Sequence, residues 1–280
     1  MKLRDVAIAI ASCSLAAVAG AVPVVLSNGT TSVEVQGGDA VNGLVPYDGY
    51  FRYTDLANAE ETTWSVDPVL KLRDGSTAVL SAGGASGLGS ASLVAGAAES
   101  SATSAYVSTT ASTVLVGTNA RTTFTFAALP GASLDGTTFI FYVESDLFGA
   151  ADTAAFTGSI GGGDLMLFQY DTALGGLTVR MTAEAGAGSV LSLFGAGLWT
   201  GWGTSLEGGD LTVLSADGSN FETAGDLGLA FAFTLSGSSA TVVVNYDTQP
   251  LPPITVPEPG SLALAGLAVA ALGAVRRKRA

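Results

Sequence analysis

The run Leu229-Ala230-Phe231-Ala232-Phe233-Thr234-Leu235 alternates large apolar residues with smaller ones. Successive side chains of a β-strand point to opposite faces of a sheet, so this period of two predicts a strand with one large-residue face. Residues 177–182 and 123–126 show the same period. Residues 137–143 are apolar at every central position, which indicates a strand in mid-sheet, covered on both faces. Further strand candidates are 112–116, 165–170, 211–214 and 241–246.

Turn signals separate these runs. Three Asp-Gly pairs occur, at Asp74-Gly75, Asp135-Gly136 and Asp217-Gly218. In each pair the Asp side chain can accept a hydrogen bond from the backbone that follows, and the glycine allows positive φ. No segment of the body shows a convincing helical stripe, and no regular repeat occurs. The pattern therefore predicts an all-β single domain over residues 22–248, of β-sandwich or jelly-roll-like type.

Two stretches interrupt the strand pattern. Residues 81–104 are nearly all Ala, Gly and Ser, with Glu99 as the only charge. We interpret them as a long loop; the alternative is small-residue strands that pack closely. Residues 249–256 contain Pro250, Pro252 and Pro253, which predict a stiff, extended spacer after the domain.

The carboxyl-terminal residues show three features in order. Pro257-Glu258-Pro259 comes first, residues 262–275 carry no charge, and four basic residues then follow at Arg276, Arg277, Lys278 and Arg279. A helix of about 14 to 16 residues would span roughly 21–24 Å, which is short for a bilayer and leaves a buried core helix as an alternative. The basic block favours a single transmembrane helix whose charged end stays in the cytoplasm.

This arrangement resembles the PEP-CTERM sorting signal of Gram-negative bacteria, over residues 257–280. The resemblance implies that an exosortase, a membrane transpeptidase-like protease, processes the tail near Pro257, Glu258 and Pro259. It also implies a location at the cell surface or in the extracellular matrix, because many such proteins accompany exopolysaccharide export. The tail then indicates where the domain goes, and leaves open what the domain does there.

The amino-terminal residues are consistent with export. Lys2 and Arg4 precede an apolar segment at 6–18, and Ala19-Gly20-Ala21 supplies the small residues that signal peptidase needs. We therefore predict a signal peptide over 1–21, with cleavage defined by Ala19 and Ala21. Residues 10–13 loosely match a lipobox, and the alternative is lipidation of Cys13.

Charge and composition exclude several function classes. The net charge is −13, and residues 22–259 hold five cations against 23 acids, hence −18. Such a surface repels nucleic acid and anionic polymers. The sequence has no histidine, and its one cysteine lies in the predicted signal peptide. These absences exclude a Ser-His-Asp triad and histidine- or thiolate-ligated zinc in the body.

One candidate site is a group of carboxylates. Glu144 and Asp146 leave the apolar run at 137–143, and Asp152 follows closely. Residues two apart on a strand share a face, so these side chains could bind calcium or act as a catalytic carboxylate pair. The alternative is a solvated strand end. No other metal and no cofactor is predicted.

A second candidate site is aromatic. Trp199 and Trp202 lie among glycines, and Asp48-Gly49 precedes Tyr50-Phe51-Arg52-Tyr53. Exposed aromatic rings can stack on the C–H faces of sugars, and the alternative is that these rings fill the core.

We therefore predict an exported, non-enzymatic structural protein of the cell surface or exopolysaccharide matrix. Its expected partners are an exosortase, the membrane through the tail helix before processing, and exopolysaccharide, with no nucleic acid. The first alternative is a carbohydrate-binding module of the exopolysaccharide layer. A glycan-active enzyme is the weaker alternative.

Overall fold

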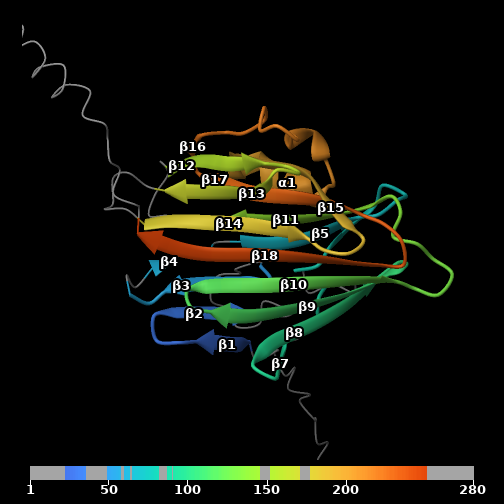
Figure 1. Cartoon of the computed structure of the whole chain (residues 1–280), viewed down its shortest axis with the longest axis horizontal. Coiled ribbons are helices and arrows are strands. Elements are labelled where there is room, and N and C mark those ends of the chain that lie inside the picture. Colours follow the sequence, from blue (N-terminus) through green and yellow to red (C-terminus); the bar gives the residue numbers. More distant parts are fainter. Residues whose placement is uncertain are drawn as a thin grey trace, which may run out of the picture.

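The computed structural model describes residues 23–35, 49–57, 60–63, 65–81, 87–89, 91–145, 152–170 and 177–250. Within these residues the chain forms three antiparallel sheets (Figure 1). The predicted signal peptide, the tail from 257 and residues 251–256 of the predicted spacer lie outside the described residues. Within the described part of the chain, every helix is too short or too polar to cross a bilayer.

The large sheet has nine strands in the order β16-β12-β13-β14-β18-β10-β9-β8-β7. They are β16 (Ala224–Gly225), β12 (Asp152–Ser159), β13 (Gly163–Tyr170), β14 (Leu177–Ala185), β18 (Ser239–Pro250), β10 (Asn119–Ala128), β9 (Val107–Val116), β8 (Ala97–Ser104) and β7 (Ser92–Val94). One face of this sheet lies on the core, and its other face, the outer face, is turned toward the viewer in Figure 1.

Two smaller sheets lie behind the large sheet (Figure 1). The five-stranded sheet has the order β15 (Ser189–Leu198), β17 (Leu227–Leu235), β11 (Thr137–Glu144), β5 (Ser65–Lys71) and β6 (Thr77–Val79). The four-stranded sheet has the order β1 (Val24–Ser27), β2 (Thr31–Val35), β3 (Phe51–Asp55) and β4 (Glu60–Glu61). The prediction of an all-β, sandwich-like domain is confirmed at this level.

Aromatic side chains hold the three sheets together. Phe124 and Phe126 of β10 each lie 4.8 Å, between ring centroids, from Phe139 of β11. Phe51 of β3 contacts both Phe141 of β11 at 6.4 Å and Tyr246 of β18 at 5.9 Å. These rings alternate with residues that point away from the core, which is the period of two expected for strands. The core is therefore continuous between the large sheet and both smaller ones.

The strand β11 is covered on both faces, as its apolar run predicts. It lies third in the five-stranded sheet, between β17 and β5. Phe139 and Phe141 enter the main core, whereas Ile140 and Tyr142 lie in a second apolar cluster on the opposite face. The helix α1 (Trp199–Glu207) covers that second face through Trp202 and Leu206.

The prediction of a body without helices is wrong at α1, and the predicted strand at 211–214 is wrong as well. Residues Leu211–Val213 form the 3-10 helix η1, which Asp210 caps by accepting a hydrogen bond from the Thr212 backbone N–H at 3.0 Å. Among the described side chains of α1, the apolar ones buried against the sheet are Trp202 and Leu206, four residues apart. So short a helix, with Gly201 and Gly203 inside it, shows almost no helical period.

The loop interpretation of 81–104 is wrong for its second half, which forms β7 and β8. Ala98, Ser100, Ala102 and Ser104 are buried along β8, and the residues between them are more exposed. In a strand built from Ala and Ser, buried and exposed positions alternate, but the hydrophobicity of the residues does not alternate with them. The alternative of closely packed small-residue strands therefore describes β8, whereas β7 is an exposed strand.

The predicted spacer is wrong at its first two residues. Gln249 and Pro250 are the last residues of β18, where they pair with Thr178 and Leu177 of β14. Proline has no N–H to donate, and the end of a strand tolerates that loss.

Two glycines that flank the Trp202 ring should respond to alanine in opposite directions. A Cβ at Gly197 would lie 2.5 Å from Cγ of Trp202, so Gly197→Ala is expected to lower the free energy of unfolding by about 1–3 kcal/mol. A Cβ at Gly201 would meet nothing within 4 Å. Because Gly201 is inside α1, Gly201→Ala should raise stability by roughly 0.5–1 kcal/mol. Urea unfolding of the two variants measures both changes, and equal effects would contradict this packing.

Candidate functional site

The predicted carboxylate site is only partly described. Glu144 ends β11 and Asp152 begins β12, and both are buried, whereas Asp146 lies outside the described residues. Gln169 of β13 joins the two strand ends, since its Nε2 donates to the Ser145 carbonyl at 2.8 Å and to Asp152 Oδ2 at 2.6 Å. Among the residues that the structure describes, no three metal-ligating side chains are grouped suitably for an ion. Calcium binding here stays a prediction.

The aromatic candidates lie mostly in the core. Tyr50, Phe51 and Tyr53 are at most 4% exposed. Trp202 is 8% exposed, meets Tyr142 edge-on at 5.6 Å, and donates from Nε1 to the Val213 carbonyl at 3.4 Å. The burial of these rings favours the core-packing alternative, and sugar stacking by Trp202 stays a prediction. The side chain of Trp199 lies outside what the structure describes.

A pocket of about 590 Å³ opens beside Trp202. It is lined by Ala196, Gly197, Leu198, Gly201, Trp202, Ser205, Thr212, Val213, Ser219, Asn220, Phe221 and Glu222. We call it the Trp202 pocket. Glu222 is the one carboxylate among these lining residues, and the Trp202 ring presents little surface to the space.

A more polar cavity lies on the outer face of the large sheet. This polar groove has a volume of about 290 Å³ and is lined by Asn119, Arg121, Met166, Arg180, Thr182, Glu184, Asn245 and Asp247. The lining side chains come from β10, β18, β14 and β13, which are neighbouring strands. The groove therefore crosses four strands at the middle of the sheet.

Strand register sets the order of side chains across the groove. Arg121 lies opposite Asn245, which lies opposite Thr182, which lies opposite Met166. Directly opposed residues of antiparallel strands share a face, so these four side chains form one row. A second row runs from Asp247 to Arg180 and then to Phe168.

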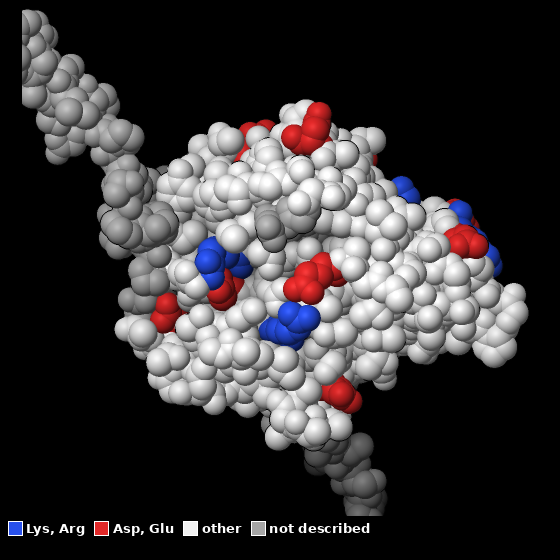
Figure 2. Space-filling model, in the orientation of Figure 1, with Lys and Arg blue, Asp and Glu red and all other residues white. Residues whose placement is uncertain are grey.

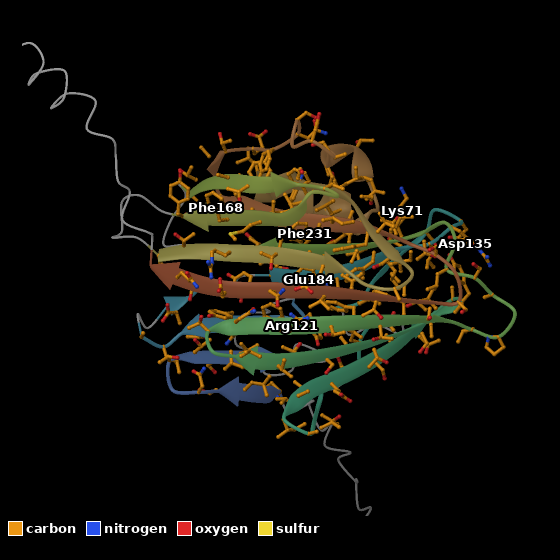
Figure 3. All side chains as sticks on the ribbon, viewed as in Figure 1. Lys71, Arg121, Asp135, Phe168, Glu184 and Phe231 are labelled. Carbon is orange, nitrogen blue, oxygen red and sulfur yellow. The ribbon has the colours of Figure 1, made fainter. Side chains whose placement is uncertain are left out.

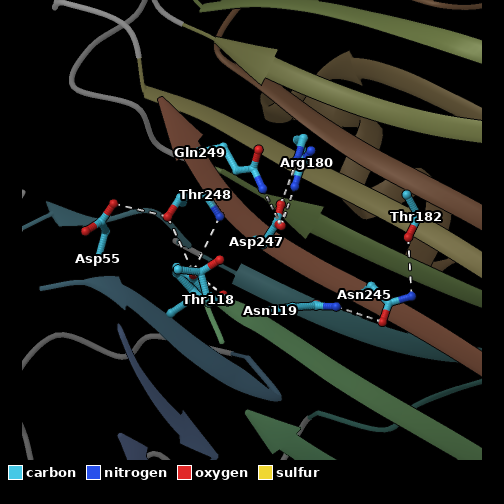
Figure 4. A network of polar contacts seen from close by, with 10 residues as sticks. Asp55, Thr118, Asn119, Arg180, Thr182, Asn245, Asp247, Thr248 and Gln249 are labelled. Carbon is cyan, nitrogen blue, oxygen red and sulfur yellow. Dashed lines mark hydrogen bonds and ion pairs between the residues drawn. The ribbon is translucent and has the colours of Figure 1, made fainter. Parts of the chain in front are cut away.

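Arg180 and Asp247 form a two-point ion pair in the second row. Arg180 Nε lies 2.9 Å from Asp247 Oδ1, and Nη2 lies 2.6 Å from Oδ2 (Figure 4). The Asp247 carboxylate raises the pKa of the Arg180 guanidinium above its ordinary value. The two side chains remain 31% and 14% exposed, so the pair faces the groove without being sealed from water.

Asn245 connects the other polar side chains of the groove. Its Oδ1 accepts from Asn119 Nδ2 at 3.1 Å and from Arg121 Nη1 at 3.4 Å. Its Nδ2 donates to Thr182 Oγ1 at 3.3 Å and to Glu184 Oε1 at 3.4 Å. Arg121 also pairs with Glu184 at 3.4 Å, across β18 (Figure 3). The groove thus holds its polar groups in defined positions before any ligand arrives.

Two aromatic rings border the groove on β13. Phe168 and Tyr170 share the outer face, are half-buried, and lie nearly parallel, with centroids 6.2 Å apart and an interplanar angle of 26°. Phe168 stands in the same row as Arg180. We call these two residues the aromatic pair. Apolar ring surface therefore adjoins the polar groove.

The outer face carries few charges, and those that line the polar groove are balanced. Figure 2 shows most of this face free of charged side chains; near its centre basic and acidic groups lie side by side, and further acidic groups lie alone toward its edges. Within the groove, the charges of Arg121 and Arg180 balance those of Glu184 and Asp247. Elsewhere the chain is strongly acidic, so the groove is a locally neutral patch on a negative protein.

The comparisons with known proteins confirm the tail. Residues 255–279 match the PEP-CTERM protein-sorting motif, which implies processing by an exosortase. Proteins with this motif are exported and sorted to the cell surface. No curated protein matches the chain in sequence.

Solved structures support the fold alone. A bacterial glucoamylase complexed with acarbose has a TM-score of 0.52 at 7% identity, covering 78% of this chain and 30% of its own. A heparinase III, the BT4657 gene product, has a TM-score of 0.43 at 8% identity, covering 79% of this chain and 32% of its own. A putative aldose 1-epimerase from Escherichia coli K12 has a TM-score of 0.42 at 9% identity, covering 82% of this chain and 99% of its own. This chain therefore spans about a third of the first two.

Proposed function

We propose that this chain is a non-enzymatic structural protein of the cell surface or exopolysaccharide matrix, and that its β-domain holds polysaccharide through the polar groove and the aromatic pair. The observation that carries this proposal is the juxtaposition of pre-arranged polar side chains with two partly exposed rings on one open sheet face. The sorting motif supports the proposal, because proteins that carry it are sorted to the cell surface.

The chemistry of the groove fits a sugar ring. Hydroxyl groups both donate and accept, and the groove offers carboxylate and amide oxygens together with guanidinium and amide N–H groups. Apolar C–H faces of a pyranose can lie on the aromatic pair. The open course of the groove across four strands suits a polymer that passes over the surface.

The placement of the two groove carboxylates supports a binding role over catalysis. Asp247 lies opposite Arg180, and Glu184 lies opposite Val243, so four residues along β18 separate the two acids. Their Cα atoms are therefore about 13 Å apart along the strands, but the Glu184 carboxylate reaches toward Asp247, since Asn245 Nδ2 donates to its Oε1 at 3.4 Å. Glycosidases place their two carboxyl groups on either side of the sugar bond. Glu184 and Asp247 instead share one open face.

The test is binding of the processed protein, purified from producing cells, to exopolysaccharide from the same cells by affinity electrophoresis. We expect Arg180→Ala/Asp247→Ala to raise the Kd about tenfold or more, a loss of roughly 1.4 kcal/mol. The double replacement removes both charges and leaves neither without its counter-ion.

A matched control removes an ion pair from another sheet. Arg52 of β3 and Glu34 of β2 pair at 3.9 Å on the four-stranded sheet. Arg52→Ala/Glu34→Ala should leave the Kd unchanged. Equal losses in both double variants, or binding that neither variant alters, would remove the polar groove as the polymer site.

A further inference from the structure

The arginines of the polar groove are already engaged by carboxylates. Arg180 donates two hydrogen bonds to Asp247, and Arg121 lies against Glu184 and Asn245. A guanidinium has five N–H donors in a planar fork, so Arg180 keeps three beyond those that Asp247 accepts. These remaining donors suit hydroxyl groups, which bind without separating the ion pair.

An acidic sugar meets a different environment. A carboxylate, sulfate or phosphate group that approaches Arg180 also approaches Asp247, and one that approaches Arg121 also approaches Glu184. The acidic group of the sugar must therefore displace a protein carboxylate from the guanidinium, or it is repelled by that carboxylate at close range. The body of the chain, at −18, adds a long-range repulsion of the same sign.

From this geometry we infer that the polar groove selects an uncharged, hydroxyl-rich polysaccharide and rejects acidic ones. The inference rests on the proposed function and names its ligand class. The Arg180–Asp247 and Arg121–Glu184 pairs are the specificity-determining elements, because they offer hydrogen bonds of both kinds while presenting no net charge. The aromatic pair adds an apolar surface that does not depend on ligand charge.

The experiment separates exopolysaccharide of the producing cells into neutral and acidic fractions by anion exchange. Each fraction is titrated against the processed protein at about 20 mM and about 500 mM NaCl, because the higher concentration largely screens surface electrostatics and the lower one does not. We expect binding to the neutral fraction, with a Kd that changes less than about twofold between the two salts. The acidic fraction should bind at least about tenfold more weakly at low salt.

Asp247→Asn provides a second readout in a protein of nearly unchanged shape. The amide cannot neutralise Arg180, so this variant should gain affinity for the acidic fraction, and the gain should disappear at high salt. Absence of that gain would overturn the role given to the ion pair.

The remaining outcomes distinguish the inference from the proposed function. Preferential binding of the acidic fraction, lost in Arg180→Ala/Asp247→Ala, would overturn the uncharged ligand class and leave the groove as the polymer site. Absence of binding to both fractions, or binding that Arg180→Ala/Asp247→Ala does not change, would refute the proposed function, and the ligand class would fall with it.

Discussion

Replacement of Phe139 by Ala is expected to lower the free energy of unfolding by about 3–5 kcal/mol. Phe139 is fully buried on β11 and contacts Phe124, Phe126 and Phe233, so its ring joins the large and five-stranded sheets. Natural domains are stable by only about 5–15 kcal/mol, so the variant should lose a large part of its stability. Urea unfolding followed by circular dichroism measures the change.

Val190 provides the control for this substitution. It lies on β15 in the same five-stranded sheet but is 62% exposed. Val190→Ala should change the free energy of unfolding by less than about 1 kcal/mol. If Phe139→Ala cost no more than Val190→Ala, the stacking of the large sheet on the five-stranded sheet would be contradicted.

The second large effect concerns the sorting motif. Replacing Arg276, Arg277, Lys278 and Arg279 by Ser is expected to abolish processing of the tail and delivery to the surface. A basic end holds a short apolar helix with that end in the cytoplasm, and serine removes this preference. Gel mobility of the chain, together with its distribution between membrane and surface fractions, measures the outcome.

A charge-preserving variant is the matched control for the tail. Changing the three arginines at 276, 277 and 279 to Lys keeps four positive charges, so processing should continue. Normal processing and surface delivery of the serine variant would refute the role assigned to the basic block.

The two-residue period of the strands predicted much of the fold because the buried positions of those strands hold large apolar residues. The run at 229–235 became β17, and 137–143 became β11 in mid-sheet. The three Asp-Gly pairs occupy turns, with φ of 86°, 78° and 78° at Gly75, Gly136 and Gly218. Where the inward residues were Ala and Ser, as in β8, the same alternation was invisible in hydrophobicity.

The strand β5 shows a different limit of sequence reasoning. It contains Pro68 and Asp67, both unfavourable inside a strand, and both are buried there. Ser65 of the same strand and Ser81, from beyond the strand β6, donate hydrogen bonds to Asp67, so a contact from outside β5 helps to satisfy a carboxylate that strand propensity disfavours. Single-segment patterns do not contain such contacts.

The polar groove was not predicted because it depends on strand order. The alternation around Arg180 indicates that this side chain points away from the core, and Arg121 lies in a similar position on β10. The sequence does not show that β18 lies between β10 and β14, which brings Asn245 and Asp247 between the two arginines. The sorting motif, by contrast, is a local sequence pattern, so it was recognised from the sequence alone.

The central claim, that the polar groove on the outer face holds polysaccharide, is tested most directly by mapping the contact on the protein. Amide and side-chain NMR shifts of the processed protein can be followed during titration with the neutral exopolysaccharide fraction. We expect the largest changes at Asn119, Arg121, Arg180, Asn245 and Phe168. Changes confined to the Trp202 pocket, or the absence of any change at saturating polymer, would contradict the account.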